Sequence, residues 1–445
     1  MEKKVIIVGA GLVGSLWAIY MSKAGYNVTI YERRSDIRNT RISAGKSINL
    51  ALSNRGWKAL KTVGIDNVVR KIAIPMSGRI MHALNGELTY QSYGKDNEAI
   101  YSVSRAHLNA IMMDLAEKKG NAKILYNYQC LDADLESGKI KLKNLSNNEI
   151  IEDSANIVFA ADGAFSAVRY NAMQKRDRFN YSQFFIEDGY KELLLPADKN
   201  GNYKIEKNAL HIWPRGKFML IALPNENGSF TCTLFMPYEN HKYAFNRLNS
   251  DDKIEKFFET IFPDFYKLVP NLTENWHQNP LSSLSIVRCE PWTIGKFALM
   301  GDSAHATVPF YGQGMNAGFE DCSVMWEIYN KHKNWHQTFE EYSKKRKPDG
   351  DALQELSLDN YYVMSADVAD KKFLLQKKIE ARIHEKYPDK WMPLYSQVTF
   401  SDIPYSKAYL QGKKQDKIMK EILQDPMINE KWDSSEIENK ILSLI

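Results

Sequence analysis

The chain has few cysteines and no long apolar run. Its four cysteines, Cys130, Cys232, Cys289 and Cys322, include no CxxC pair and no metal-ligating spacing with histidine. This usage excludes a disulfide scaffold and a structural zinc site, and predicts reduced thiols in a protein core. No apolar stretch reaches the roughly 18 residues of a membrane helix. We therefore expect a cytoplasmic protein with no metal site and no transmembrane anchor.

Neither sign of charge dominates. The chain has 59 basic and 54 acidic residues, which give a formal net charge of +5, and both kinds are spread along its length. Nucleic-acid binding needs clustered basic residues, so no nucleic-acid partner is expected. A length of 445 residues with 44% hydrophobic residues predicts two or three structural units with sizeable cores. We expect a protein that acts on a small molecule.

A nucleotide-binding pattern opens the chain. The stretch KVIIVGAGLVGSLWAIYMSKAGYNVTIYERR predicts a strand, a glycine turn, a helix and a second strand. Gly9, Gly11 and Gly14 form G-x-G-x-x-G, in which the glycines permit the turn, the approach of a pyrophosphate and close helix packing. Glu32 ends the second strand, where a carboxylate accepts hydrogen bonds from a ribose hydroxyl. This pattern favours FAD or NAD over NADP.

Two later segments each predict a strand that ends in aspartate. IVFAADGAFSAVR delivers Asp162 and KFALMGDSAH delivers Asp302 at the carboxyl end of a strand, where open α/β sheets bind ligands. The second segment continues as GDSAHATVPFYGQGMN, and a helix that starts near Gly314 would point the N–H groups of Gly314, Met315 and Asn316 outward. That positive end suits the anionic edge of a reduced flavin. The alternative is a glycine-rich turn in a packed core.

The remaining chain predicts strands and then helices. In the range 181–285, Met219, Ile221 and Leu223 share one face of an expected antiparallel meander, and such a face packs on a helix or lines a pocket. The predicted fold class is α/β, with a Rossmann-like FAD-binding domain, an interleaved antiparallel β-sheet substrate domain and a C-terminal helical section. The expected boundaries are 1–75, 101–180 and 286–330 for the FAD-binding domain, 76–100 and 181–285 for the substrate domain, and 331–445 for a helical section that covers the substrate site.

The segment GRIMHALNGELTYQSYG predicts a hairpin. A three-residue turn over 85–87 sets Arg79 opposite Tyr93 on one face, whereas a two-residue Asn-Gly turn would separate them. From the residues alone, a solvated strand arginine is the simpler interpretation of Arg79. Asn360 and Met364 stand four residues apart and share a face if that stretch is helical.

These motifs resemble a known family. GAGLVG with Glu32, ADGAFSAVR and GDSAHATVPFYGQGMN, in this order and spacing, resemble the flavoprotein aromatic hydroxylases. AGKSINLALSNRG, SGRIMHALNG, NALHIWPRG, DNYYVMS and YSQVTFSDIPY are similar to one branch of it, the kynurenine 3-monooxygenases, and the resemblance extends to about residue 410. It implies non-covalent FAD, reduced by NADPH, that reacts with O2 to a flavin C4a-hydroperoxide and hydroxylates L-kynurenine to 3-hydroxy-L-kynurenine. The charged tail, broken by Pro426, predicts a form without a C-terminal membrane anchor.

The resemblance also implies site residues, and it requires none as a catalytic acid or base. For FAD it implies contacts from Glu32, Ala51, Arg105, Asp302, Met315 and Asn316, with 309–313 shaping the flavin face. At the amino-acid end of the substrate it implies Arg79, Tyr93, Asn360 and Tyr395. Around the ring it implies Leu210, Ile221, Leu223, Phe235, Pro309, Phe310 and Met364.

Three alternatives stay open. Another aromatic hydroxylase, acting on a phenol or benzoate, would share the flavin segments and differ only in the substrate pocket. A flavin halogenase would carry W-x-W-x-I-P, whereas Trp213 stands alone in HIWPRG. A dinucleotide-binding sensor without turnover would use the strands as an interaction surface, and substrate-stimulated NADPH oxidation would exclude it.

Overall fold

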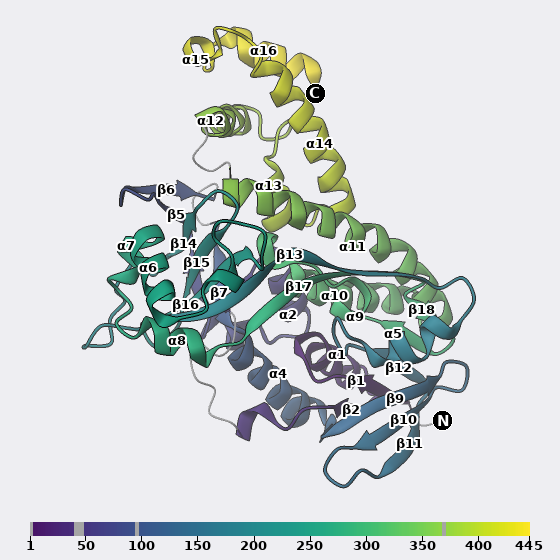
Figure 1. The fold of residues 1–445 in the computed structure, drawn as a ribbon. Coiled ribbons are helices and arrows are strands. Elements are labelled where there is room, and N and C mark those ends of the chain that lie inside the picture. Colours follow the sequence, from purple (N-terminus) through teal and green to yellow (C-terminus); the bar gives the residue numbers. More distant parts are fainter. Residues whose placement is uncertain (1–2, 40–48, 94–97, 367–370) are drawn as a thin grey trace.

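The computed structural model describes residues 3–39, 49–93, 98–366 and 371–445 (Figure 1). Residues 44–48, at the start of the AGKSINLALSNRG motif, lie outside these ranges. Two large sheets form the body of the molecule, and the carboxyl-terminal helices extend from it at the top of Figure 1. The α/β class with a C-terminal helical section is confirmed.

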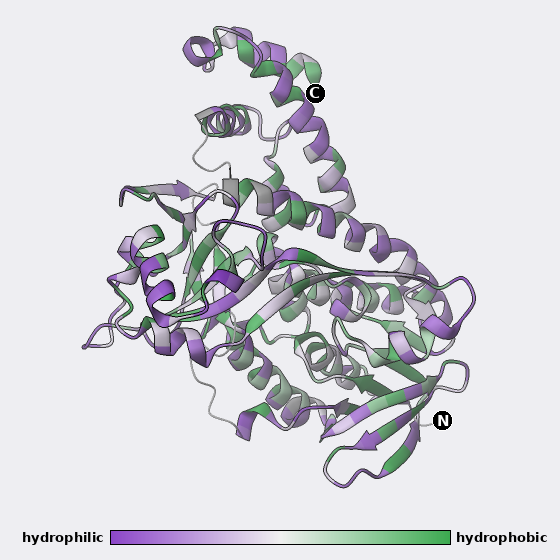
Figure 2. Ribbon diagram, in the orientation of Figure 1, coloured by the Kyte–Doolittle hydropathy of each residue, from purple (hydrophilic) through white to green (hydrophobic). Residues whose placement is uncertain are grey.

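A six-stranded sheet carries the nucleotide-binding pattern. Its order is β18-β19-β12-β1-β2-β8, and all neighbours are parallel except β18 and β19. The central strands β1 and β12 are short, continuous apolar runs because helices cover both faces of a parallel sheet, and both are hydrophobic in Figure 2. The strands are β1 (Lys4–Val8), β2 (Asn27–Glu32), β8 (Lys123–Tyr126), β12 (Ile157–Ala160), β18 (Thr293–Ile294) and β19 (Phe297–Leu299).

Helices and two small sheets surround this sheet. Each predicted strand-turn-helix step is confirmed: β12 leads through Ser166, which accepts a hydrogen bond from the Arg169 amide at 3.1 Å, and β19 leads to a helix that begins at Asp302. The helices are α1 (Leu12–Lys23), α2 (Asn54–Thr62), α3 (Asp66–Arg70), α4 (Arg105–Gly120), α5 (Ala167–Asn171), α9 (Asp302–His305) and α10 (Gly314–His332). The small sheets contain β3 (Asn49–Leu52), β4 (Ile74–Met76) and β7 (Ile100–Ser104), and β9 (Tyr128–Asp134), β10 (Lys139–Asn144) and β11 (Ile150–Ser154).

A seven-stranded sheet of order β17-β13-β16-β15-β14-β5-β6 forms the second body. Its neighbours are antiparallel except β14 and β5, which run parallel, so the expected antiparallel sheet is mixed at this one pair. More than a hundred residues separate these two strands, so no hairpin dictates their relative direction. The strands are β5 (Gly78–His82), β6 (Leu88–Ser92), β13 (Asn180–Leu195), β14 (Ala209–Pro214), β15 (Met219–Pro224), β16 (Phe230–Pro237) and β17 (Leu281–Glu290).

The two faces of this sheet have different surroundings. Leu220, Cys232 and Leu234 belong to the face that packs against α6 (Asp251–Ile261), α7 (Pro263–Tyr266) and α8 (Leu272–Gln278). Met219 and Phe235, on the opposite face, pack toward α11 (Trp335–Ala366) and the 3-10 turn η4 (Pro309–Tyr311). Further 3-10 turns are η1 (Ile37–Asn39), η2 (Met173–Lys175) and η3 (Phe245–Arg247).

The hairpin between β5 and β6 differs from its predicted register. Arg79 lies opposite Gln91 rather than Tyr93, whose amide donates to the carbonyl of Ser77 at 3.2 Å. The loop covers residues 84–86 instead of 85–87, because Gly86 takes a φ of +85° and closes it one residue earlier. The shift of two residues preserves the alternation of the strand, so Arg79 and Tyr93 still share a face as diagonal neighbours.

The carboxyl-terminal section is helical, as predicted. Its helices are α11 (Trp335–Ala366), α12 (Lys371–Lys386), α13 (Leu394–Thr399), α14 (Tyr405–Ile422), α15 (Ile428–Lys431) and α16 (Ser435–Leu444). Hydrophilic residues dominate much of α11 in Figure 2. Throughout the described ranges, no helix has the length and apolar character needed to cross a membrane. All four cysteines are free and buried, as expected.

Candidate active site

The three predicted nucleotide segments meet at one edge of the six-stranded sheet. Val8 of β1 pairs with Ala160 of β12, and Ala160 pairs with Leu299 of β19. Because these strands are parallel and in register, the turns that follow them lie side by side at their carboxyl ends. Asp162 and Asp302 therefore lie at the same edge as the glycine turn.

The three glycines of G-x-G-x-x-G serve two purposes. A side chain at Gly9, where φ is +100°, would place its Cβ 2.5 Å from the carbonyl oxygen of Ala161, and one at Gly14 would lie 2.0 Å from the carbonyl oxygen of Gly9. Both positions thus need glycine for packing. Gly11 has no described atom within 4 Å of the Cβ position, and no side chain caps α1, which begins at the next residue. An open approach to free helix N–H groups fits a pyrophosphate.

Glu32 is a buried carboxylate with one acceptor position left. Its Oε2 accepts from the Ala10 amide at 2.8 Å, and its Oε1 accepts from the amide and Nε of Arg34 at 2.9 and 2.8 Å. Burial alone would raise the pKa of Glu32, but the hydrogen bonds and charge of Arg34, together with the Ala10 amide, hold it below its ordinary value. With two acceptor positions on each oxygen, Oε2 can take one further donor, as a ribose hydroxyl requires.

The glycine-rich segment ends in α10 at Gly314, as predicted, and its preceding residue Gln313 provides no side-chain cap. Both N–H groups of the Asn316 side-chain amide are used within the protein: Nδ2 donates to the carbonyls of Ala51 at 2.8 Å and Gly312 at 2.9 Å, and Oδ1 accepts from the Ser53 amide at 2.9 Å. The donor that Asn316 leaves for a ligand is therefore its backbone N–H. Ala51 is brought to this helix end by the same hydrogen bonds.

Other predicted cofactor residues lie around this edge. Asp162 Oδ2 accepts from the Ala167 amide at 2.7 Å, whereas its buried Oδ1 has no hydrogen-bond partner in the described part of the chain. Burial raises the pKa of this carboxyl, against hydrogen bonds to Oδ2 and from Ser166. Asp302 and Arg105 are exposed at the starts of α9 and α4, and Met315 is buried in α10. This edge therefore offers an unpaired acceptor at Asp162, an open approach at Gly11 and the uncapped starts of α1 and α10. These features fit FAD.

Cross-strand pairing places the predicted substrate residues of the second sheet on one face. One row runs from Arg79 on β5 to Leu210 on β14. The next row joins Ile221 on β15 to Thr233 on β16, and a third joins Met219 to Phe235. Leu223 alternates with Ile221 along β15 and so faces the same side. This side packs against η4 and α11.

Arg79, Tyr93 and Tyr395 come together at one end of that face. The Tyr93 and Tyr395 rings stack at 5.2 Å, and the Arg79 guanidinium lies 5.8 Å from the Tyr395 ring centre. The Tyr93 hydroxyl is buried and makes no hydrogen bond to any described residue, and Arg79 has no carboxylate partner among them. Burial and the neighbouring Tyr395 raise the pKa of Tyr93, so it stays a neutral donor. An unpaired cation beside an unpaired donor is suited to an anion.

The apolar end gathers around Phe310. Its ring meets Phe235 edge-on at 5.0 Å, and Met364 belongs to the same buried cluster, with Leu210 and Ile221 packed against it. Asn360 lies beside this cluster, where its Nδ2 donates to the Phe310 carbonyl at 2.8 Å and to Met364 Sδ at 3.2 Å. Asn360 thus orders the ring end, rather than joining Arg79. Pro309 is exposed at the edge of η4.

Tyr311, which lies in the predicted stretch 309–313, stacks on Tyr395 at 5.7 Å. Two further residues of this region escaped sequence reasoning: Tyr361 stacks on Phe310 at 4.1 Å, and Phe400 tilts toward Tyr93 at 6.2 Å. Each is one to five residues from a predicted site residue, so the only sequence signal was proximity within the same motif. Stacking partners depend on tertiary placement, which no local pattern encodes.

The edge and the two sheets define the class of protein: an FAD-binding enzyme with the fold of flavin-dependent hydroxylases. The model of the FAD binding domain family matches residues 2–357. Among solved structures, the chain is similar to 2-methyl-3-hydroxypyridine-5-carboxylic acid oxygenase, with a TM-score of 0.67 and 19% identity over 82% of this chain and 94% of that one. It is also similar to the tetracycline destructase Tet(55), with a TM-score of 0.63 and 15% identity over 85% and 94%. These two likenesses concern the fold alone.

Proteins similar in sequence show which family within this class the chain belongs to. The chain is 49% identical to the kynurenine 3-monooxygenase of Christiangramia forsetii over 100% of this chain and 99% of that protein. It is 50% identical to that of Flavobacterium psychrophilum over the same shares, and 42% identical to that of Sus scrofa over 93% and 88%. The chain belongs to the kynurenine 3-monooxygenase family.

Proposed function

We propose that this protein hydroxylates the aromatic ring of L-kynurenine to give 3-hydroxy-L-kynurenine. Non-covalent FAD is the cofactor, and NADPH and O2 are the co-substrates. One oxygen atom enters the ring and the other leaves as water, while NADPH and a proton supply the two electrons and two hydrogens that water formation needs. The observation that carries the proposal is the group of Arg79, Tyr93 and Tyr395 at one end of an apolar face.

The polar end supplies what an α-amino-acid carboxylate requires. The Arg79 guanidinium offers a planar fork of donors, and the Tyr93 hydroxyl offers a further donor that lacks a protein partner within the described ranges. The stacked rings of Tyr93 and Tyr395 shield this end from water, which strengthens the pairing of charges. A carboxylate bound here exchanges its own water molecules for these fixed donors, and its oxygens replace the water that hydrates Arg79.

Strand geometry supports a substrate whose carboxylate is remote from the ring. The row of Arg79 and the row of Phe235 are two steps apart along the strands, and each step of two residues covers about 6.7 Å. The polar and apolar ends are therefore about 13 Å apart along the strand direction, and Arg79 and Phe235 also lie three strands apart across the sheet. A benzoate carries its carboxylate directly on the ring and does not span this separation, whereas kynurenine places a flexible arm between the two groups.

The residues of the nucleotide edge would hold FAD: Gly11 and the start of α1 at the pyrophosphate, Glu32 at the ribose, and the start of α10 at the flavin. FAD, when bound and reduced, supplies the electrons that activate O2 for transfer to the ring. The chain itself binds the substrate, orients the ring against Phe235 and Phe310, and excludes water through the apolar cluster. The aromatic amine of kynurenine activates the ring position next to it, so no acid or base residue is assigned. Four buried free cysteines support a cytoplasmic location.

The test is product identification. The FAD-loaded protein is incubated with NADPH, O2 and L-kynurenine, and the products are measured by mass spectrometry together with the rate of NADPH oxidation. We expect a mass gain of one oxygen atom and NADPH oxidation that L-kynurenine stimulates. Equal NADPH oxidation with and without L-kynurenine, and no hydroxylated product, would contradict the proposal. 4-Hydroxybenzoate is the control substrate, and it should be left unchanged.

A further inference from the structure

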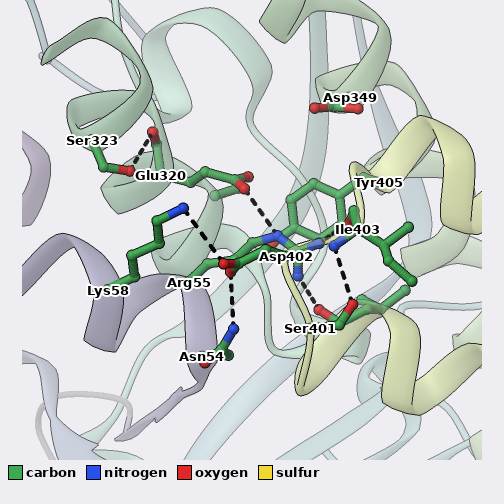
Figure 3. Close-up of polar contacts among 12 residues, drawn as sticks. Asn54, Arg55, Lys58, Glu320, Ser323, Asp349, Ser401, Asp402, Ile403 and Tyr405 are labelled. Atoms are coloured by element: carbon green, nitrogen blue, oxygen red, sulfur yellow. Dashed lines mark hydrogen bonds and ion pairs between the residues drawn. The ribbon is translucent and has the colours of Figure 1, made fainter. Parts of the chain in front are cut away.

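A buried arginine joins the start of α2 to the carboxyl-terminal section. The Arg55 side chain is 0% exposed. Its Nη1 donates to the carbonyl of Val398 and its Nη2 to the carbonyl of Ile403, while Nε donates to Glu320 Oε1 at 3.1 Å. Figure 3 shows Arg55 between Glu320 and the chain segment that precedes Tyr405. One side chain of α2 thus contacts two parts of the chain that are distant from it in sequence, Glu320 and the segment 398–403.

The charges around Arg55 indicate which part of the chain its removal would disturb. Glu320 also pairs with Arg346, whose Nη1 lies 2.7 Å from Glu320 Oε2. Removal of the Arg55 side chain therefore leaves Glu320 paired with Arg346, although its Oε1 loses the hydrogen bond from Nε, and the carbonyls of Val398 and Ile403 lose their Arg55 donors. An unpaired buried carbonyl is costly, so the segment that carries both must move toward water or another donor. The disturbance falls on residues 398–403.

That segment is continuous with a member of the polar end. Val398 belongs to α13, only three residues after Tyr395. A helix of six residues is not stable alone, and no side chain caps its start at Pro393, so its position depends on tertiary contacts. Tyr395 in turn lies between the rings of Tyr93, at 5.2 Å, and Tyr311, at 5.7 Å. Movement of α13 would therefore displace the Tyr395 ring from Arg79.

A second contact ties the same joint to the flavin side of the site. The Arg55 guanidinium lies 4.1 Å from the ring centre of Tyr405, the first residue of α14. The Tyr405 hydroxyl donates to Gln313 Oε1 at 3.0 Å, and Gln313 directly precedes α10. Tyr405 thus links Arg55 to the residue that precedes the proposed flavin-binding helix.

We propose that Arg55 is a positioning residue for the substrate site: through α13 it holds Tyr395 beside Arg79 and Tyr93 and so sets the affinity for the amino-acid end of the substrate. Arg55 does not touch the substrate. The inference rests on the proposed function, because L-kynurenine is the ligand whose carboxylate this end would bind.

A double-mutant cycle tests whether Arg55 acts through Tyr395. The Kd of L-kynurenine is measured by calorimetry on FAD-loaded protein without NADPH, for Arg55→Met, Tyr395→Ala and both together. We expect Arg55→Met to raise this Kd about tenfold in the parent chain and less than about twofold in the Tyr395→Ala background. The Kd of FAD, measured by flavin fluorescence, should stay within about twofold. Equal effects of Arg55→Met in both backgrounds, or no effect in either, would overturn the inference.

Lys58→Ala is the matched control. Lys58 lies one turn after Arg55 on α2 and pairs with Asp402 at 3.5 Å, but this contact is at the surface and involves no backbone carbonyl. Its Kd for L-kynurenine should change less than about twofold. If Arg55→Met does not fold, Arg55→Lys replaces it in the cycle, since one ammonium group keeps the charge but cannot span both carbonyls.

Hydrogen exchange separates this inference from the proposed function. Arg55→Met should speed amide exchange over 394–403 and leave α1 unchanged, whether or not L-kynurenine is present. If the parent protein fails to bind L-kynurenine, the proposed function is wrong, and faster exchange confined to 394–403 would still support the positioning of α13. Unchanged exchange over 394–403 would refute it.

Discussion

Replacement of Arg79 by alanine is the perturbation that most directly tests the polar end. Arg79 is half-buried, has no carboxylate partner among the described residues and lies 5.8 Å from the Tyr395 ring centre. Its removal should leave the cofactor edge intact, because Arg79 lies on β5 of the seven-stranded sheet, whereas the glycine turn, Asp162 and Asp302 follow strands of the six-stranded sheet. We expect loss of L-kynurenine affinity with normal FAD content and an unchanged flavin spectrum.

The magnitude follows from the environment of the guanidinium. Two unit charges about 4 Å apart at an effective dielectric constant of about 20 attract by about 4 kcal/mol. Because Arg79 is partly exposed, solvent screens its ion pair with the substrate carboxylate. We therefore take the contribution of this pair to binding as about 3 kcal/mol, between the values for buried and surface ion pairs. Each 1.4 kcal/mol is a factor of ten in Kd, so Arg79→Ala should weaken L-kynurenine binding about a hundredfold.

The assay is calorimetric titration of the FAD-loaded variant with L-kynurenine, followed by NADPH oxidation at several substrate concentrations. Arg79→Lys should show a smaller loss, because an ammonium group keeps the charge without the fork. Arg247→Ala is the control, since Arg247 is an exposed arginine beside the same sheet whose Nε donates to a backbone carbonyl. Near-normal kcat/KM for L-kynurenine in Arg79→Ala would refute this assignment and favour a hydroxylase whose substrate lacks the amino-acid arm.

Three further predictions concern single side chains. Tyr395→Phe keeps the stacked ring and loses one hydroxyl, so titration should show an L-kynurenine Kd raised about three- to tenfold. Glu32→Gln removes a charge-assisted acceptor, so flavin fluorescence should report FAD affinity reduced about tenfold or more, and an unchanged value would place the ribose elsewhere. Burial raises the pKa of Glu192 from 4.5 to about 7, against the nearby charge of Arg105. The folded apoprotein therefore keeps a proton that the unfolded chain has lost, and its stability falls as the pH rises through this interval. Thermal unfolding should show Glu192→Gln more stable relative to the parent at pH 8 than at pH 5, and an equal difference at both values would contradict this.

The cofactor edge was the part of the molecule that the sequence could predict. Each of its segments is a contiguous strand and turn, and the carboxyl ends of parallel strands meet at one edge whatever lies between them. Gly14 must be glycine because a Cβ there would meet Gly9 in the same turn. Gly9 must be glycine because a Cβ there would meet Ala161, which follows the adjacent strand β12. Local patterns therefore carried the information. The fate of the Asn316 side chain did not follow from them, because its partner Ala51 comes from a distant strand.

The seven-stranded sheet shows where local reasoning fails. The turn between β5 and β6 contains Asn-Gly, and several loop lengths are compatible with that dipeptide; the positive φ of Gly86 at the last loop position decides among them. The parallel pairing of β5 with β14 depends on strands separated by more than a hundred residues. The buried contacts of Arg55 are equally non-local, since an arginine in a helix pattern ordinarily predicts an exposed residue.

The difference between these two regions has a functional consequence. Most of the cofactor edge comes from the six-stranded sheet and the helices that follow its strands, with Ala51 of β3 held at the start of α10, whereas the polar end needs β5, the end of β6 and α13 at once. Long-range contacts of this kind are independent of the strand register that pairs Val8 with Ala160 and so brings the glycine turn beside the turn that contains Asp162. Substitutions that displace α13 or β5 should therefore alter affinity for the substrate while FAD binding persists. Substrate choice in this family can then change through the second sheet and the carboxyl-terminal helices without loss of the cofactor.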